Sequence, residues 1–165
     1  MTDIRKTNDD PVSQFWDVLD DVHAGMLGIE GSGQHLQPMA PMADPEARSI
    51  WFFTRNDSDL VRALGAASRA HFVLIGEDHD YHACVAGDLV RNLDPVKRDE
   101  FWNPMIGAWF EGKDDPDLTM LQLRLSDGVV WASASNPVRF GWEMVKANLT
   151  DEQPDIGVRK HVQFG

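Results

Sequence analysis

Short apolar segments separated by tight turns recur along this chain, and this hairpin pattern limits the possible folds more than any other feature. Met26–Glu30 and His35–Met42 flank Gly31-Ser32-Gly33, which predicts a β-hairpin with a glycine turn. A second hairpin is predicted where His71–Gly76 is followed by a polar turn and the long strand Tyr81–Leu93. Because tight turns join antiparallel neighbours, these segments predict an antiparallel sheet.

Further strands are predicted from composition and alternation. Ser49–Thr54 is rich in aromatic residues, and Leu121–Ser126 alternates leucine with polar residues, so both are predicted to be strands. Asp127-Gly128 is predicted to turn the second of these into another strand, Val129–Ala134.

Helices are predicted between the hairpins. Asp10 as N-cap and a proline at the first helical position open the first helix, which has an apolar stripe. This first helix begins at Pro11 and is closed by Gly25. Three more helices are predicted over about residues 57–67, from Pro95 to Trp102, and from Pro137 to about Asn148. Hairpins with inserted helices and no βαβ alternation predict a mainly β protein, an antiparallel barrel with peripheral helices.

The length of 165 residues fits a single domain, 1–165, in which roughly 70% of the surface of the unfolded chain can be buried. The first ten residues are polar, and residues 150–165 begin with a stretch rich in Asp, Glu, Gln and Pro. We therefore expect residues 1–10 and 150–165 to be flexible tails, or the second tail to lie on a partner.

Charge and composition exclude several classes of partner. Fifteen Lys and Arg against 27 Asp and Glu give a net charge of −12, which argues against a basic face for nucleic acid. No apolar run approaches the ~20 residues that a membrane span needs, and Met1–Lys6 lacks the apolar stretch of a signal peptide. The single cysteine, Cys84, cannot form an internal disulfide, so a cytoplasmic location is predicted.

A series of short motifs carries the functional information. Gln37-Pro38-Met39-Ala40-Pro41 precedes the strand Ser49–Thr54 and the helix start Asn56-Asp57-Ser58. Three more motifs follow in order: Trp102-Asn103-Pro104-Met105, Trp109-Phe110 and Asp114-Asp115-Pro116-Asp117. From about Phe15 to Met144 the chain resembles the pyridoxamine 5′-phosphate oxidase-like FMN-binding split barrels, specifically their general stress protein branch. The resemblance implies an antiparallel split β-barrel, a homodimer, and the small-molecule flavin FMN as cofactor.

The resemblance also implies which residues hold the isoalloxazine ring of FMN. Main-chain groups of Gln37–Met39 would contact the ring, and Phe53 and Thr54 would line it. Trp109 and Phe110 would lie near the flavin of the neighbouring subunit, across the dimer interface. Since flavin supplies the redox chemistry itself, no catalytic residue is identified. Whether the chain is an FMN-dependent oxidoreductase, and with which substrate, stays open.

The phosphate of FMN is implied to lie among three further positions. The family has an arginine just before Pro-Met, a hydroxyl at the helix start and a lysine two residues later; here these are Gln37, Ser58 and Leu60. Charge-assisted hydrogen bonds contribute ~1.5–3 kcal/mol each, so losing two cations would weaken phosphate binding by roughly 10²–10⁴-fold. Arg55 and Arg62 are nearby cations that partly replace them.

Two alternatives remain open at this point. Gln37 and Leu60 favour a flavin-free split-barrel dimer that acts as a binding or structural protein. Relatives of this superfamily also bind deazaflavin or haem, and no residue here selects either. Asp57 with Ser58 is equally typical of a helix N-cap that holds no ligand.

Other chemically active side chains are assigned no ligand. Glu77–His82 contains histidines and carboxylates, but they lie at a predicted turn with unspecific spacing, so no metal is predicted. Cys84 lies within a predicted strand without an adjacent base or cation, so it is predicted to be buried and unreactive.

Overall fold

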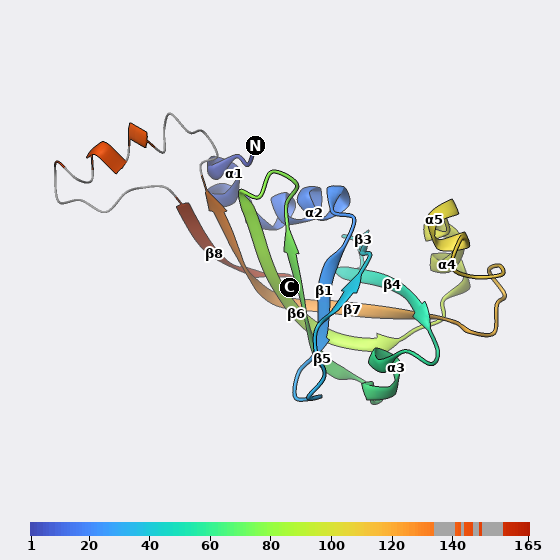
Figure 1. The fold of residues 1–165 in the computed structure, drawn as a ribbon. Helices are drawn as coiled ribbons and strands as arrows, with labels where there is room; N and C mark the ends of the chain where they lie inside the picture. Colours follow the sequence, from blue (N-terminus) through green and yellow to red (C-terminus); the bar gives the residue numbers. More distant parts are fainter. Residues whose placement is uncertain (134–140, 143, 147–148, 150–156) are drawn as a thin grey trace.

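The computed structural model describes residues 1–133, 141, 142, 144–146, 149 and 157–165. Its strands are β1 (Gly25–Ile29), β2 (Gln37–Met39), β3 (Met42–Asp44), β4 (Ser49–Arg55), β5 (Ser68–Ile75), β6 (Tyr81–Arg91), β7 (Leu118–Ser133) and β8 (Gly157–Gln163). Its helices are α1 (Ile4–Asp9), α2 (Pro11–Asp21), α3 (Asp59–Ala63), α4 (Pro95–Phe101) and α5 (Pro104–Gly107). Figure 1 shows a curled sheet with helices around it.

A very short connection joins the two edges of the sheet. The strand order is β2-β1-β5-β6-β7-β4-β3, and all of these neighbours are antiparallel. The strands at the two ends of this order, β2 and β3, are consecutive in the chain and separated by Ala40 and Pro41. Opposite edges joined by two residues force the sheet to curl, and it forms a half-barrel (Figure 1). The predicted antiparallel, mainly β fold with peripheral helices is confirmed.

The long strand β7 pairs with two different strands along one of its edges. Its first part, Leu118–Arg124, pairs with β4, and its second part, Asp127–Ser133, pairs with β8. On its other side β7 pairs with β6 from Leu121 to Ala132, with a register shift that leaves Ser126 between the partners of Ala86 and Gly87. Such a bulge increases the local twist of the strand, so β4 and β8 can diverge from the same edge.

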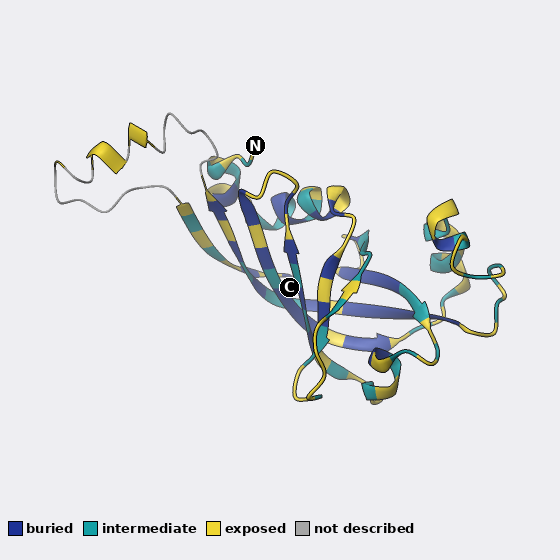
Figure 2. Ribbon diagram, viewed as in Figure 1, coloured by how far each residue is buried: buried dark blue, intermediate teal, exposed yellow. Residues whose placement is uncertain are grey.

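The core lies on the concave side of the sheet and beneath α2. Figure 2 shows the buried positions concentrated on the strands and on the inner side of α2. Phe52 and Phe72 are fully buried, with ring centroids 5.2 Å apart, and Phe15 of α2 packs edge-on against Phe164 at 5.3 Å. Each such side chain contributes about 1.5–3 kcal/mol through burial, so the sheet is held by many similar contributions.

The predicted turn at Asp127-Gly128 is wrong, because β7 continues through it as one strand. A Cβ on Gly128 would lie 2.8 Å from Val85 Cγ1 and 2.9 Å from the carbonyl oxygen of Cys84. The glycine therefore permits a close approach of β6 to β7, and the absence of a side chain there is unrelated to a turn.

The prediction of flexible tails is also wrong for much of both ends. Residues 4–9 form α1, whose N-cap Asp3 accepts a hydrogen bond from the Arg5 amide. Residues 157–163 form β8, and Val162 and Phe164 are buried in the core. Within the tail, 150–156 lie outside the described residues, as does the predicted start of the last helix at Pro137.

Two predicted helices are shorter than expected. The first ends at Asp21, because Gly25 already belongs to β1, where an added Cβ would lie 2.6 Å from the Val73 carbonyl oxygen. The predicted helix over residues 57–67 is reduced to the five residues of α3. None of the helices in the described part of the chain is both long and apolar enough to cross a membrane.

Candidate functional site

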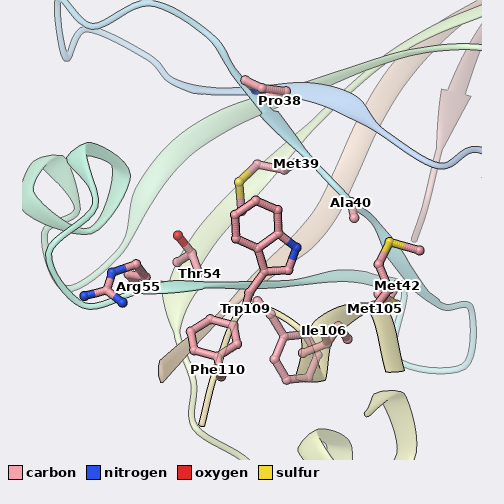
Figure 3. Close-up of a pocket in the computed structure, with 11 residues that line it drawn as sticks. Pro38, Met39, Ala40, Met42, Thr54, Arg55, Met105, Ile106, Trp109 and Phe110 are labelled. Carbon is pink, nitrogen blue, oxygen red and sulfur yellow. The ribbon is translucent and has the colours of Figure 1, made fainter. Parts of the chain in front are cut away.

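A pocket of about 410 Å³ opens where the two edges of the sheet meet. We call residues 37–44, which comprise β2, Ala40, Pro41 and β3, the seam, and this cavity the seam pocket. Its size lies within the range of small-molecule sites. The pocket is lined by Pro38, Met39, Ala40, Met42, Phe53, Thr54, Arg55, Met105, Ile106, Trp109 and Phe110 (Figure 3).

The sheet supplies one wall of the seam pocket. Pro38 can lie in β2 because β2 is an edge strand, and a proline there removes no ladder hydrogen bond on its open side. β4 pairs with β7 over its whole length, which fixes Phe53 opposite Met120 and Thr54 opposite Thr119. This wall is therefore positioned by continuous backbone pairing.

The second wall consists of α5 and the residues after it. Asn103 caps α5 by accepting a hydrogen bond from the Ile106 amide at 3.0 Å, and Ile106 is itself 7% exposed. By contrast, Met105 is 60% exposed and Trp109 is 78% exposed although both line the pocket. In Figure 3 the indole of Trp109 extends from this wall toward the seam. One buried side chain thus anchors a largely exposed wall.

An ion pair between a buried carboxylate and a half-buried lysine ties the two walls together. Asp44 of β3 is 5% exposed and receives hydrogen bonds from Lys97 Nζ at 2.9 Å and Trp51 Nε1 at 3.0 Å. Burial alone would raise the pKa of Asp44, but the hydrogen bonds from Lys97 and Trp51 outweigh it and hold the pKa below its usual value. Since Lys97 lies on α4, this carboxylate links the seam to the helices that precede Trp109.

Arg55 is the one charged residue among the described residues that line the pocket. Its Nε lies 3.1 Å from Asp57 Oδ1, and its Nη2 lies 3.0 Å from Asp117 Oδ2. The hydrogen bond to Asp57 raises the pKa of Arg55, and in turn Arg55 lowers the pKa of Asp57. The only cation of the pocket lining is therefore already paired with two carboxylates.

Seven of the residues predicted from the sequence line this one pocket. They are Pro38, Met39, Phe53, Thr54, Arg55, Trp109 and Phe110. The structure brings Trp109 to the same cavity as Met39 within a single chain, so this juxtaposition needs no second subunit. The resemblance places the aromatic pair near the flavin of the neighbouring subunit, and this position across a dimer interface stays a prediction.

Four predicted residues lie outside the pocket lining. Gln37 pairs with Leu27 at the start of β2, and Ser58 caps α3, its hydroxyl accepting a hydrogen bond from the Val61 amide. Leu60 is 1% exposed and belongs to the core, so its side chain offers nothing to a phosphate. The guanidinium of Arg62 is paired with Asp59 at 3.3 Å.

The sequence prediction missed four residues of the pocket lining: Ala40, Met42, Met105 and Ile106. A signal for the last two was present, because Asn103-Pro104 has the N-cap and first-turn residues of a helix. Ala40 belongs to the motif Gln37–Pro41 but is assigned no role there, and Met42 reaches the pocket through the closing of the seam, a long-range property that a local pattern does not contain.

The other chemically active groups lie elsewhere. Cys84 is half-buried in β6, and burial together with nearby Asp127 raises the pKa of its thiol. His79 lies at the turn between β5 and β6 with a φ of 58°. In the described residues, no three His, Cys, Asp or Glu side chains come together as metal ligands.

Comparison with known proteins agrees with this geometry. Residues 10–155 match the family described as pyridoxamine 5′-phosphate oxidase like. General stress protein 26 of Bacillus subtilis (strain 168) is 28% identical over 116 residues, which are 67% of this chain and 81% of that protein.

Two solved structures are similar over most of the fold. The crystal structure of a protein assigned as general stress protein 26 from Jannaschia sp. CCS1 has a TM-score of 0.79 and 38% identity, covering 93% of this chain and 98% of that one. The general stress FMN/FAD binding protein from Xanthomonas citri has a TM-score of 0.68 and 35% identity, covering 74% and 89%. With its curled antiparallel half-barrel, this chain belongs to the pyridoxamine 5′-phosphate oxidase-like family.

Proposed function

We propose that this protein binds a flavin, with FMN as the expected cofactor, and that the isoalloxazine ring lies in the seam pocket. The observation that carries the proposal is the composition of the lining: apart from Thr54 and Arg55, the residues around the cavity are apolar or aromatic. A flat, largely apolar ring is the kind of ligand that such a lining favours.

The polar edge of a flavin ring also has potential partners here. β2 has a strand neighbour on one side, β1, so backbone groups on its open side are available for hydrogen bonds. The hydroxyl of Thr54 lies at the pocket as well. The residues present therefore fit the ring of a flavin, which needs apolar contact on its faces and hydrogen bonds along one edge.

A relative supports the same ligand. The Xanthomonas citri protein, 35% identical to this chain, is named as a general stress FMN/FAD binding protein. The two structures are similar over 74% of this chain, with a TM-score of 0.68. The ligand is proposed for this chain because the relative and the pocket chemistry point to the same ring.

Such a site would support FMN-dependent oxidoreduction. A bound flavin supplies hydride transfer, while the residues of this chain bind and orient its ring and shield it from water. Within the described residues, the pocket lining contains no carboxylate, imidazole or thiol. The protein part of the site would thus act through positioning, and the substrate is not specified by these side chains.

The test is a titration of purified protein with FMN, followed by visible absorbance and equilibrium dialysis. We expect saturable binding that Ala40→Phe abolishes, because the larger ring fills the pocket from the seam. Ala47→Phe is the matched control, since Ala47 lies in the exposed turn between β3 and β4. If the unmodified protein does not bind FMN, the proposal is wrong and a flavin-free binding or structural protein remains. If both variants bind FMN equally well, the proposed position of the ring is wrong.

We further propose that the protein is a homodimer. The outward side of the sheet carries a row of residues that are neighbours across adjacent strands: Met26, Val73, Cys84 and Val129. Met26 is exposed, and the other three are half-buried. Trp131 beside them is 40% exposed. Contiguous apolar surface of this kind is typical of protein interfaces. Sedimentation velocity at micromolar concentration should give a dimer, and a stable monomer would exclude it.

A further inference from the structure

The charge at the Arg55 end of the seam pocket is unfavourable for an anion. Arg55 contributes one positive charge, and its partners Asp57 and Asp117 contribute two negative charges. In Figure 3 the guanidinium lies at one side of the pocket, beyond Thr54. A ligand group that reaches this end therefore meets a cluster with a net charge of −1.

The groups on α3 do not offset this charge. Arg62 is paired with Asp59, so that pair is neutral as a whole. The Ser58 hydroxyl, which accepts a hydrogen bond from the Val61 amide, carries no charge, and Leu60 is buried in the core. No described residue of this helix presents an unpaired cation to the pocket.

A phosphate monoester carries about −1.5 to −2 charges at neutral pH. To pair with Arg55 it would have to displace a carboxylate and then remain beside Asp57 and Asp117. These three side chains are 49%, 64% and 58% exposed, so solvent screens their charges without changing the sign of the cluster. The net charge of −12 acts in the same direction.

We propose that the seam pocket recognises a flavin by its ring alone and gives no preference to a terminal phosphate. Its ligand class is the isoalloxazine ring with a neutral or a phosphorylated side chain: riboflavin and lumiflavin bind as well as FMN does. This inference rests on the proposed function, because it describes how the same pocket would hold the flavin.

The first experiment compares three ligands on the same protein. FMN, riboflavin and lumiflavin are titrated separately, and we expect their three dissociation constants to differ less than fivefold. If even one charged donor bound the phosphate, the affinity for FMN would exceed that for riboflavin by roughly ten- to hundredfold. A fivefold or larger preference for FMN would overturn the inference and leave flavin binding intact, whereas failure of all three ligands would overturn both.

The second experiment changes the charge directly. In Asp57→Asn/Asp117→Asn, Arg55 is free to pair with a phosphate, so FMN should tighten about fivefold or more while riboflavin is unchanged. Asp114→Asn is the control, because Asp114 is 95% exposed, pairs with Arg98 and lies outside the pocket lining. If the double variant leaves the ratio of the two affinities unchanged, the carboxylates are not what prevents a phosphate contact, and the inference is wrong.

A salt titration of the unmodified protein gives the same answer without any substitution. Because the cluster repels a phosphate, FMN affinity should stay constant or rise as salt increases, and riboflavin affinity should stay constant. An FMN affinity that falls severalfold with salt, with riboflavin unchanged, would show an attractive phosphate site and overturn the inference.

Discussion

The two walls of the seam pocket are built in opposite ways. The sheet wall consists of residues whose positions follow from strand pairing, and beneath it lie fully buried rings such as Phe52. The α5 wall is a four-residue helix held by Ile106 and, through α4, by Lys97. Figure 2 shows the contrast, with buried positions along the sheet and mostly exposed ones at α5. One wall is therefore part of the fold, and the other is attached to it.

This difference separates stability from ligand binding. Substitutions under the sheet wall should strongly destabilise the protein, because they remove contacts of the buried core. Substitutions at the tip of the α5 wall should change the pocket and leave the fold intact, since exposed side chains contribute little to stability. The link between Asp44 and Lys97 should affect both properties.

The largest effect is expected beneath the sheet wall. Phe52→Ala removes a fully buried ring that packs against Phe72, so it should lower the free energy of unfolding by about 3–5 kcal/mol. Urea denaturation followed by circular dichroism measures this loss. A loss below 1 kcal/mol would show that the sheet wall is not more firmly built than the α5 wall.

The link between the walls should give an intermediate effect. Asp44→Ala leaves the Trp51 indole N–H without its acceptor and leaves Lys97 with Glu100 as its remaining partner, which should cost about 2–3 kcal/mol of unfolding free energy. Flavin affinity of the folded fraction should also fall, because α4 is no longer held at β3. Asp114→Ala, at an exposed ion pair, is the control and should change stability by less than about 0.5 kcal/mol.

The tip of the α5 wall should affect binding alone. Trp109→Ala removes an exposed ring from the pocket, so flavin affinity should fall about tenfold, which corresponds to 1.4 kcal/mol. The melting temperature should stay within about 2 °C of the unmodified protein. Thermal melts beside flavin titrations distinguish this outcome from that of a core tryptophan, which would lower the melting temperature and leave affinity unchanged.

The smallest effect concerns pH. The folded-state pKa of Asp44 is lowered, so its stabilising contribution is complete above the unfolded pKa of about 4 and is lost as pH falls through the folded pKa. Asp44→Asn should therefore be less stable than the unmodified protein at pH 7, and the gap should narrow at pH 3. Urea denaturation measures the difference in the free energy of unfolding between the two proteins. If this difference is the same at both pH values, the charge of Asp44 does not contribute to the link.

Much of the sheet could be predicted from the sequence because alternation and turn residues are local signals. The predicted strand Ser49–Thr54 and the predicted helix from Pro95 to Trp102 lie within a residue or two of the observed elements. The turn at Asp127-Gly128 failed because a glycine that permits close strand approach and a glycine that permits a turn look alike in sequence.

The site could be predicted in part for a similar reason. The seam and the aromatic pair are contiguous motifs, so most of the lining was identified. The pairing of Arg55 with Asp117 joins residues 62 positions apart and depends on the folded loop, so no local pattern contains it. The burial of Leu60 did have a local signal, because Leu60, Val61 and Leu64 form an apolar face. At the position where the family has a phosphate-binding lysine, this chain has a core residue.

The most direct test of flavin binding at the seam is a crystal structure of the protein grown with a saturating concentration of riboflavin or FMN. We expect the isoalloxazine ring between the sheet wall at Phe53 and Thr54 and the α5 wall at Trp109. A structure that shows the flavin bound at another surface, or an empty seam pocket at saturating flavin, would contradict the proposed site.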